Sequence, residues 1–183
     1  SDVSLFPVFT NPVDWEQRIT ALSANSYGLE ANSGLSFNKV SLFLSYAYNK
    51  SLLKKGKNYS FPSSQDFRHS ASFNFSFHPK ENTGWNFTWN FHSGGPYTFP
   101  NELFMDEEGR PVLSFSQRNG QRYKSYHSAN ISYRKRSVFS ALKLDLELGI
   151  RNLYNRKNPI FVYLGNSEEG SAAYQFSALP IHP

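Results

Sequence analysis

Cysteine is absent from this chain of 183 residues, which excludes a disulfide framework, thiolate metal ligands and a cysteine nucleophile. No stretch approaches the roughly 18 consecutive apolar residues of a transmembrane helix, and the chain does not open with the basic and apolar start of a signal peptide. Charged residues are scarce, at 18%, whereas aromatic residues reach 17%. Disordered chains are poor in aromatic residues, so the composition predicts a folded chain, either one domain or part of a larger one.

A strong charge excess is also lacking. The formal net charge is +5, and the lysines and arginines are spread thinly along the sequence. A small, dispersed excess of this kind is typical of a solvated surface, so no nucleic-acid partner is expected.

Strict alternation of apolar and polar residues dominates what is present. In a β-strand, successive side chains point to opposite faces, so each alternating run predicts a strand with one apolar and one polar face. The runs cover residues 40–48, 70–78, 85–92, 127–133 and 142–151, with a weaker run at 27–35.

The length and chemistry of these runs favour membrane-spanning strands. The runs last roughly 8–11 residues, which matches the roughly 9–11 residues that a tilted strand needs to cross a bilayer. Their apolar positions are large, whereas the other positions carry mostly Ser, Asn, Thr and His. Lipid outside and water inside a barrel require this pattern. The first prediction is that Phe75, Phe87, Trp89, Leu144 and Leu146 face lipid. The inward-facing set is Asn74, Asn90 and Asp145. The alternative is a soluble antiparallel sheet with its apolar face on a core.

The connections between these strands alternate in length. Residues 37–39, 79–82 and 134–140 are predicted to be short turns, and residues 51–68, 94–124 and 155–173 long loops. Outer-membrane barrels have short periplasmic turns and long outer loops. The strands beginning at Val40, Trp85 and Leu142 would then run outward, and their neighbours inward.

Aromatic residues fall near the expected membrane boundaries. Tyr46 and Tyr48 lie at an outer strand end, and Phe77, Trp85 and Tyr133 at inner ends. Amphipathic rings favour the headgroup layer, although aromatic residues also fill strands well in general.

The strand count predicts an incomplete barrel. Six strands are expected, with a seventh starting near Ala172, whereas bacterial single-chain barrels have an even number of at least 8. We therefore expect an all-β, antiparallel transmembrane barrel segment over residues 1–183, whose edge strands pair with strands beyond this sequence.

Four segments resemble the C-terminal barrel region of Bacteroidetes-type TonB-dependent outer-membrane receptors. They are Ser26-Tyr27-Gly28-Leu29-Glu30, Asp66-Phe67-Arg68-His69, Gly94-Gly95-Pro96-Tyr97-Thr98-Phe99-Pro100 and, as the most specific match, Ile150-Arg151-Asn152-Leu153-Tyr154-Asn155-Arg156-Lys157-Asn158-Pro159. The resemblance covers roughly residues 15–183. It is closer to receptors with a carboxypeptidase-regulatory-like domain than to the starch-utilisation type.

This resemblance implies a 22-stranded barrel with an N-terminal plug, located in the Gram-negative outer membrane. It also implies import of a scarce substrate, driven through TonB. The sequence holds no plug, no TonB box and no final strand with a terminal aromatic residue. The implied partners are therefore the remaining strands and the plug, in the same or another chain, together with TonB, outer-membrane lipids and an imported substrate.

The run at 142–151 carries the first candidate site. Lys143, Asp145, Glu147 and Arg151 alternate with leucines on one face of a single strand. A Lys or Arg at the bilayer midplane costs roughly 2–4 kcal/mol, so these side chains are expected to face the lumen. Docking of a plug is the preferred role, and substrate contact is the alternative.

The second candidate site is the long loop at 94–124. Loops of this length are uncommon unless functional, so Tyr97, Phe99, Phe104 and Tyr123 are candidate substrate contacts; a self-packed loop shielding the barrel mouth is the alternative.

His92 and His127 are expected to line the upper lumen. The histidines show no close metal spacing, so neither a metal nor a cofactor is predicted.

Two other classes of function remain open on the sequence. An outer-membrane barrel enzyme would need a nucleophile and a base in the lumen or at its rim, and no such pair can be assembled from these residues. A soluble β-sandwich binding module would cover the apolar faces with a second sheet.

Overall fold

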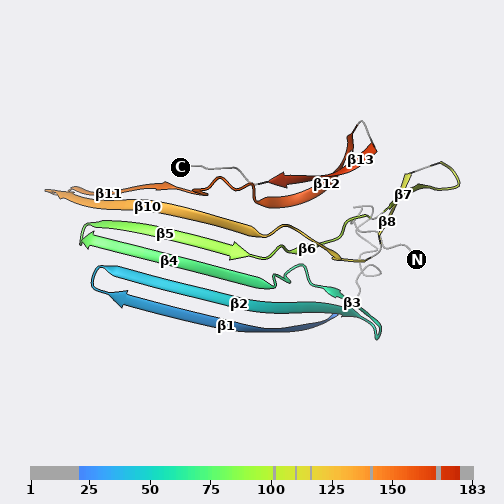
Figure 1. The fold of residues 1–183 in the computed structure, drawn as a ribbon, viewed down its shortest axis with the longest axis horizontal. Coiled ribbons are helices and arrows are strands. Elements are labelled where there is room, and N and C mark those ends of the chain that lie inside the picture. Colours follow the sequence, from blue (N-terminus) through green and yellow to red (C-terminus); the bar gives the residue numbers. More distant parts are fainter. Residues whose placement is uncertain are drawn as a thin grey trace.

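The computed structural model describes residues 21–100, 102–109, 111–115, 117–140, 142–167 and 170–177. Its main feature is one antiparallel sheet in which six long strands lie side by side in chain order (Figure 1). These strands are β1 (Ser23–Phe37), β2 (Val40–Lys55), β4 (His69–Lys80), β5 (Thr83–His92), β10 (Tyr126–Phe139) and β11 (Leu142–Ile150). The short strand β3 (Tyr59–Pro62) pairs with the far end of β2. The prediction of an all-β, antiparallel fold is confirmed.

The short connections all lie at one end of this sheet, and the long connections lie at the other (Figure 1). The β1–β2 hairpin closes through Asn38 and Lys39, and Asn38 adopts a left-handed φ of 54°. Ser140, which follows β10, has a φ of 53°. Asn tolerates this region better than most residues. The predicted alternation of short and long connections is therefore confirmed.

The predicted long loops contain strands of their own, which corrects the sequence interpretation. Within 94–124, β6 (Pro96–Tyr97) pairs with β9 (Gln121–Arg122), and β7 (Glu102–Met105) pairs with β8 (Pro111–Ser114). Within 51–68, β2 continues to Lys55 and pairs with β3. The predicted loop 155–173 holds β12 (Pro159–Ser167), which pairs with β13 (Gly170–Ser177) as a separate hairpin. The predicted turn 134–140 is also too long, because β10 continues to Phe139.

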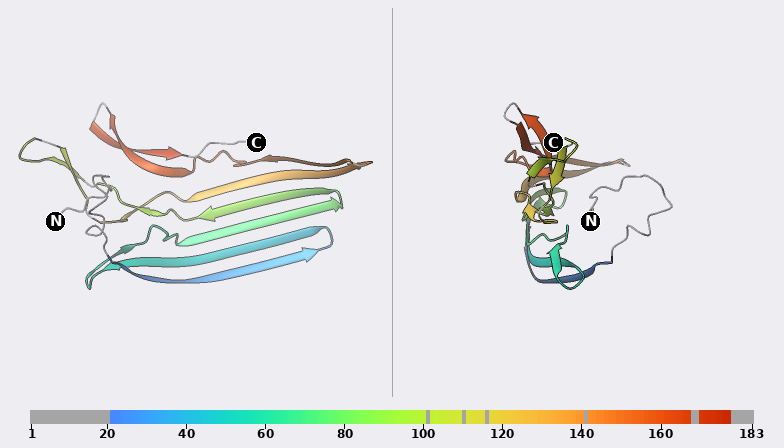
Figure 2. Two further views of the ribbon diagram at one scale, coloured as in Figure 1. Left: turned by 180° about the vertical axis from the view of Figure 1, so that it is seen from behind. Right: turned by 90° about the vertical axis from the view of Figure 1, so that its right-hand side faces the viewer.

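The long strands form a single layer, as the view along the sheet shows (Figure 2). Among the described residues, the buried apolar side chains are only Phe61, Pro96 and Ala129. Large apolar residues on the long strands are instead widely exposed; Leu142 and Leu148, for example, are 64% and 61% exposed. A soluble sheet would cover such a face with a second layer, and the described residues provide none over these strands.

The strand register gathers the apolar positions of all six strands on one face. One transverse row of paired residues reads Leu35, Leu42, Phe75, Phe87, Ile131 and Ile150. The next row toward the turns reads Phe37, Val40, Phe77, Trp85, Tyr133 and Leu148. Because side chains alternate, the opposite face carries Ser36, Ser41, Ser76, Asn86, Ser132 and Gly149 in one row.

The hairpins are progressively staggered along the sheet. The β1–β2 turn lies in the row of Tyr133, whereas β10 runs on for six residues, to Phe139, before its own turn. Four strand-to-strand steps separate these two hairpins. The six-residue offset is about 20 Å at about 3.3 Å per residue, and the four strand steps span about 19 Å at about 4.8 Å each. If the two turns lie at the same level, these distances correspond to a strand tilt of about 45°.

The described part of the chain contains no helix that is both long and apolar enough to cross a membrane.

Candidate functional site

The first candidate site is the polar face of β5, β10 and β11. Lys143, Asp145 and Glu147 alternate along β11 with the apolar face, and Arg151 follows in the same phase just after the strand. The four residues therefore share one face, as the alternation predicts. Whether that face contacts a plug or a substrate stays a prediction.

Asp145 is already paired within the sheet. Its carboxylate accepts hydrogen bonds from Arg134 on the neighbouring strand, with Nε to Oδ1 at 2.8 Å and a second, shorter contact from Nη2 to Oδ2. Arg136 Nε approaches the same Oδ2 at 3.3 Å. Side chains in these pairs are 43–61% exposed, so solvent screening leaves each pair only a small contribution to stability. Asp145 therefore meets its own sheet first and is a poor candidate for holding a plug.

Arg134 and Arg136 lie in β10, within the segment predicted to be a turn, so they are not among the predicted site residues. They continue the alternation of Asn130 and Ser132 on β10. Extending that alternation to the end of the polar run would have identified them.

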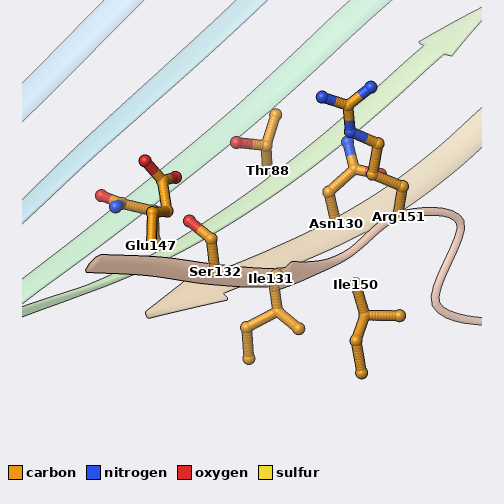
Figure 3. A pocket seen from close by; sticks show the side chains of 9 residues that line it. Thr88, Asn130, Ile131, Ser132, Glu147, Ile150 and Arg151 are labelled. Carbon is orange, nitrogen blue, oxygen red and sulfur yellow. The ribbon is translucent and has the colours of Figure 1, made fainter. Parts of the chain in front are cut away.

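A shallow pocket of about 310 Å³ lies on the polar face, and its lining includes Glu147, which is two residues from Asp145 along β11. Figure 3 shows Glu147 at one end of it and Arg151 at the other, with Ser132, Thr88 and Asn130 between them. Ile131 and Ile150 point away to the opposite side of the sheet in the same view. The pocket thus combines two opposite charges with hydroxyl and amide groups from three strands.

The polar side chains of this pocket fall into two groups. Asn86 Oδ1 accepts a hydrogen bond from Ser76 at 2.9 Å, and Asn130 Oδ1 accepts one from the Asn152 backbone N–H at 3.0 Å. Among the described residues, the remaining polar side chains make no hydrogen bond, although the charge of Glu147 interacts with Arg134 on the neighbouring strand. This second group is Thr88, Ser132, Glu147 and Arg151.

A buried carboxylate joins two of the long connections at the other end of the sheet. Asp66 is 0% exposed and accepts hydrogen bonds from the Ser51 backbone N–H at 2.7 Å and from Arg68 Nε at 2.8 Å. Arg122 of β9 also pairs with Asp66 and donates to the backbone carbonyl of Gly94 at 3.1 Å. We call Asp66, Arg68 and Arg122 the loop latch.

The loop latch determines the ionisation of its carboxyl group. Burial raises the pKa of Asp66, but hydrogen bonds from Arg68, the Ser51 backbone and Arg122 lower it by more, so the net pKa lies below its ordinary value. Asp66 is therefore a carboxylate at neutral pH.

The structure brings together three of the four predicted aromatic contacts of the 94–124 segment. The rings of Tyr97 and Tyr123 stack with centroids 4.3 Å apart, and Phe99 lies 6.0 Å from Tyr97. Burial, and to a lesser extent Tyr123, raises the pKa of Tyr97. The side chain of Phe104 lies outside the described residues. The stacking fits the self-packed alternative, and a role in substrate contact stays a prediction.

The two candidate histidines do not share a face. His92 pairs with Tyr126 across β5 and β10 and stacks on its ring at 4.8 Å on the polar face. His127 is the next residue along β10 and therefore points to the apolar side, where its Nδ1 lies 2.7 Å from the Tyr154 hydroxyl. The two histidines therefore cannot both line a lumen, and His127 lies on the face that carries the large apolar residues.

Amphipathic rings border the apolar face at both ends. Toward the long connections, the Tyr46 hydroxyl lies 2.8 Å from His69 Nδ1, and Tyr48 contacts the same ring. Toward the turns, Trp85 and Tyr133 lie with ring centroids 4.8 Å apart. Tyr48 lies eight residues along β2 from the row of Trp85 and Tyr133, which corresponds to about 26 Å along the strand and, with a strand tilt of about 45°, to a height of about 19 Å.

Among the described residues, no group of three His, Asp or Glu side chains could hold a metal ion. Comparison with known proteins adds no assignment, because no family model, curated protein or solved structure matches the chain.

Proposed function

We propose that this chain forms part of the wall of an outer-membrane β-barrel and belongs to a TonB-dependent receptor that imports a scarce substrate. The observation that carries the proposal is the single-layer sheet with one large exposed apolar face and no core. Burying apolar surface is the main favourable term in folding, and lipid is the environment in which such a face needs no second layer.

The geometry of the sheet supports a transmembrane orientation. A tilt of about 45° is close to the roughly 35–45° of transmembrane barrels, and an apolar face with aromatic girdles at both borders is typical of them. Short turns at one end and long connections at the other fit the periplasmic and outer sides.

The edges of the sheet support a larger assembly. Within the described residues, β1 and β11 each have one long edge without a neighbouring strand. Unpaired backbone N–H and C=O groups in lipid cost several kcal/mol each, so only a closed barrel is stable there. The remaining strands are therefore the first partners of this chain. The receptor class, the plug and TonB rest on the resemblance of the four ordered segments.

Single cysteines can test the lipid-facing and inward-facing assignments, because the native chain has none. Leu146→Cys on the apolar face and Glu147→Cys on the polar face are adjacent residues of β11 and form a matched pair. In outer membranes, Glu147→Cys should react with a water-soluble maleimide, and Leu146→Cys should react only with a maleimide that partitions into lipid.

Equal reaction of both variants with the water-soluble reagent would refute the barrel and favour a soluble sheet. The receptor class has a separate test, since depletion of TonB should abolish energised substrate uptake by the native assembly. Uptake that continues without TonB would leave the barrel in place and refute the receptor assignment.

A further inference from the structure

Lysines gather where β2 reaches the end of the sheet with the long connections, and in the turn to β3 (Figure 1). Lys50, Lys54, Lys55 and Lys57 fall within eight residues, and no acidic residue lies between them. Among the described residues, none of these lysines forms an ion pair with a carboxylate. An uncompensated cluster of this kind creates a positive potential that attracts anions.

The alternation of β2 divides these lysines between the two sides of the sheet. Lys50 and Lys54 are in phase with Tyr46 and Tyr48, so they continue the apolar face beyond its aromatic border. Lys55 is in the opposite phase and belongs to the other side. Two positive charges therefore follow directly on the apolar face.

The ammonium group of Lys50 is held on this side by an aromatic ring. Its Nζ lies 5.7 Å from the centroid of the Tyr27 ring, and Tyr27 is its register partner on β1. A cation–π contact orients the ammonium group but does not neutralise its charge. The group also keeps its three N–H donors for an anion.

The heights of these two lysines place them in the headgroup layer of the proposed barrel's outer leaflet. Lys50 lies two residues beyond Tyr48, which is about 7 Å along the strand and, with a tilt of about 45°, about 5 Å in height. Lys54 lies four residues further along, about 9 Å higher. Amphipathic rings mark the level where hydrocarbon meets headgroups, so cations just beyond that level meet the charged part of a lipid.

A lipid matches this surface better than a soluble anion does. Leu52 lies between the two lysines on the same side and is only partly buried. The surface then continues without interruption into the exposed apolar positions Leu29 and Leu44. A soluble anion would use the charges alone, whereas a lipid uses both the charges and the apolar surface.

We propose that Lys50 and Lys54 bind the phosphate-bearing headgroup of a lipid in the outer leaflet, with its acyl chains along the apolar face of β1 and β2. The inference rests on the proposed function, in which this face contacts lipid and the long connections lie outside. It adds a headgroup chemistry and a defined site to the expected contact with membrane lipids.

The test is photocrosslinking from Leu52, between the two lysines. The full receptor assembly carrying Leu52→p-benzoylphenylalanine is placed in phosphatidylcholine bilayers that contain equal small fractions of phosphatidic acid and diacylglycerol. These two probes differ only in the phosphate group. After irradiation, mass spectrometry measures the share of each lipid among the adducts. Phosphatidic acid should be enriched over diacylglycerol, and equal shares would overturn the proposal.

Charge removal provides the second arm. Lys50→Gln and Lys54→Gln should each lower the enrichment about fivefold at low salt, as expected for one lysine at an anionic membrane surface. Lys50→Arg keeps the charge and should keep the enrichment. Lys55→Gln removes the same charge from the opposite side and is the matched control. Enrichment that survives the loss of both Lys50 and Lys54, or that falls equally in Lys55→Gln, would refute the site.

Two further measurements separate the possible failures. Inorganic phosphate in millimolar excess should leave the adducts unchanged, because the acyl chains hold the headgroup at the surface; displacement would assign a simple anion site and overturn the lipid assignment. The Leu146→Cys labelling is the control for the barrel. Lipid-only labelling without enrichment refutes the lipid site alone, and labelling from water in the parent protein refutes the barrel itself.

Discussion

Replacement of Asp66 by asparagine isolates the contribution of the loop latch. The carboxylate is 0% exposed and accepts from Ser51, Arg68 and Arg122. Asparagine keeps one oxygen for the Ser51 amide but turns an NH₂ group toward two arginines, which are donors only. Removing one partner of a fully buried ion pair costs about 3–5 kcal/mol.

The expected cost here is lower, because the two arginine side chains are 31% and 32% exposed and can be rehydrated. We expect about 2 kcal/mol, which corresponds to about a thirtyfold larger population of the opened latch. The loss is local, because the latch lies outside the six-stranded ladder.

Native-state hydrogen exchange measures this opening directly. In Asp66→Asn, the amides of Ser51, Ser63 and Tyr123, which are bonded across the latch region, should exchange about thirtyfold faster than in the parent protein. Gln65→Ala, an exposed neighbour, is the matched control and should change nothing. Unchanged exchange at these amides, or equal acceleration at amides in the centre of β4 and β5, would refute the latch.

The same latch has a predicted pH dependence. The folded-state pKa of Asp66 lies below the ordinary value of 3.8. The stabilisation of the latch by its carboxylate is therefore complete above pH 3.8 and is lost as the pH falls through the folded-state pKa. Exchange at Ser51 should therefore be constant, after correction for intrinsic rates, between pH 7 and pH 5 and accelerate only below about pH 3.8. Acceleration already at pH 5 would contradict the stabilised carboxylate.

Three further changes test other parts of the structure. Phe87→Arg places a charge in the apolar band and should cost about 2–4 kcal/mol, which would remove the folded, heat-modifiable form on gels, whereas Thr88→Arg on the polar face should retain it. Gly94→Ala introduces a Cβ only 1.6 Å from the Tyr123 carbonyl oxygen, so proteolysis within 94–124 should accelerate while the sheet stays resistant. Asn38→Val places a β-branched residue at a φ of 54° and should destabilise the hairpin by about 1–2 kcal/mol, whereas Asn38→Gly should not; equal stability of the two variants would exclude strain at this turn.

Local alternation was sufficient to predict the six long strands and their two faces. The alternation pattern predicts these strands because each has large apolar side chains on one face only. A register slip of one residue would move those side chains to the opposite face. Strands without alternation were missed. The β12 segment begins Pro159-Ile160-Phe161-Val162-Tyr163-Leu164, a continuous apolar run, and the far end of β2 reads Leu52-Leu53-Lys54-Lys55.

The candidate site was predicted only in part, for a related reason. The charges of β11 could be placed on one face from their own spacing. Their partners depend on the register between β10 and β11, which pairs Glu147 with Arg134 and Asp145 with Arg136 and leaves Asp145 within hydrogen-bonding reach of both arginines. The loop latch joins residues 56 positions apart, and no local pattern predicts a contact of that range.

The strand order also has a consequence for how this sheet is built. Each long strand pairs with its nearest long neighbour in the chain, without a crossover. Formation of the sheet therefore loses little conformational entropy to the closure of long loops. Growth can proceed one hairpin at a time, with the newest strand always serving as the template edge for the next. In the proposed barrel, a sheet whose described residues form no core of their own can thus enter the membrane in two-stranded units.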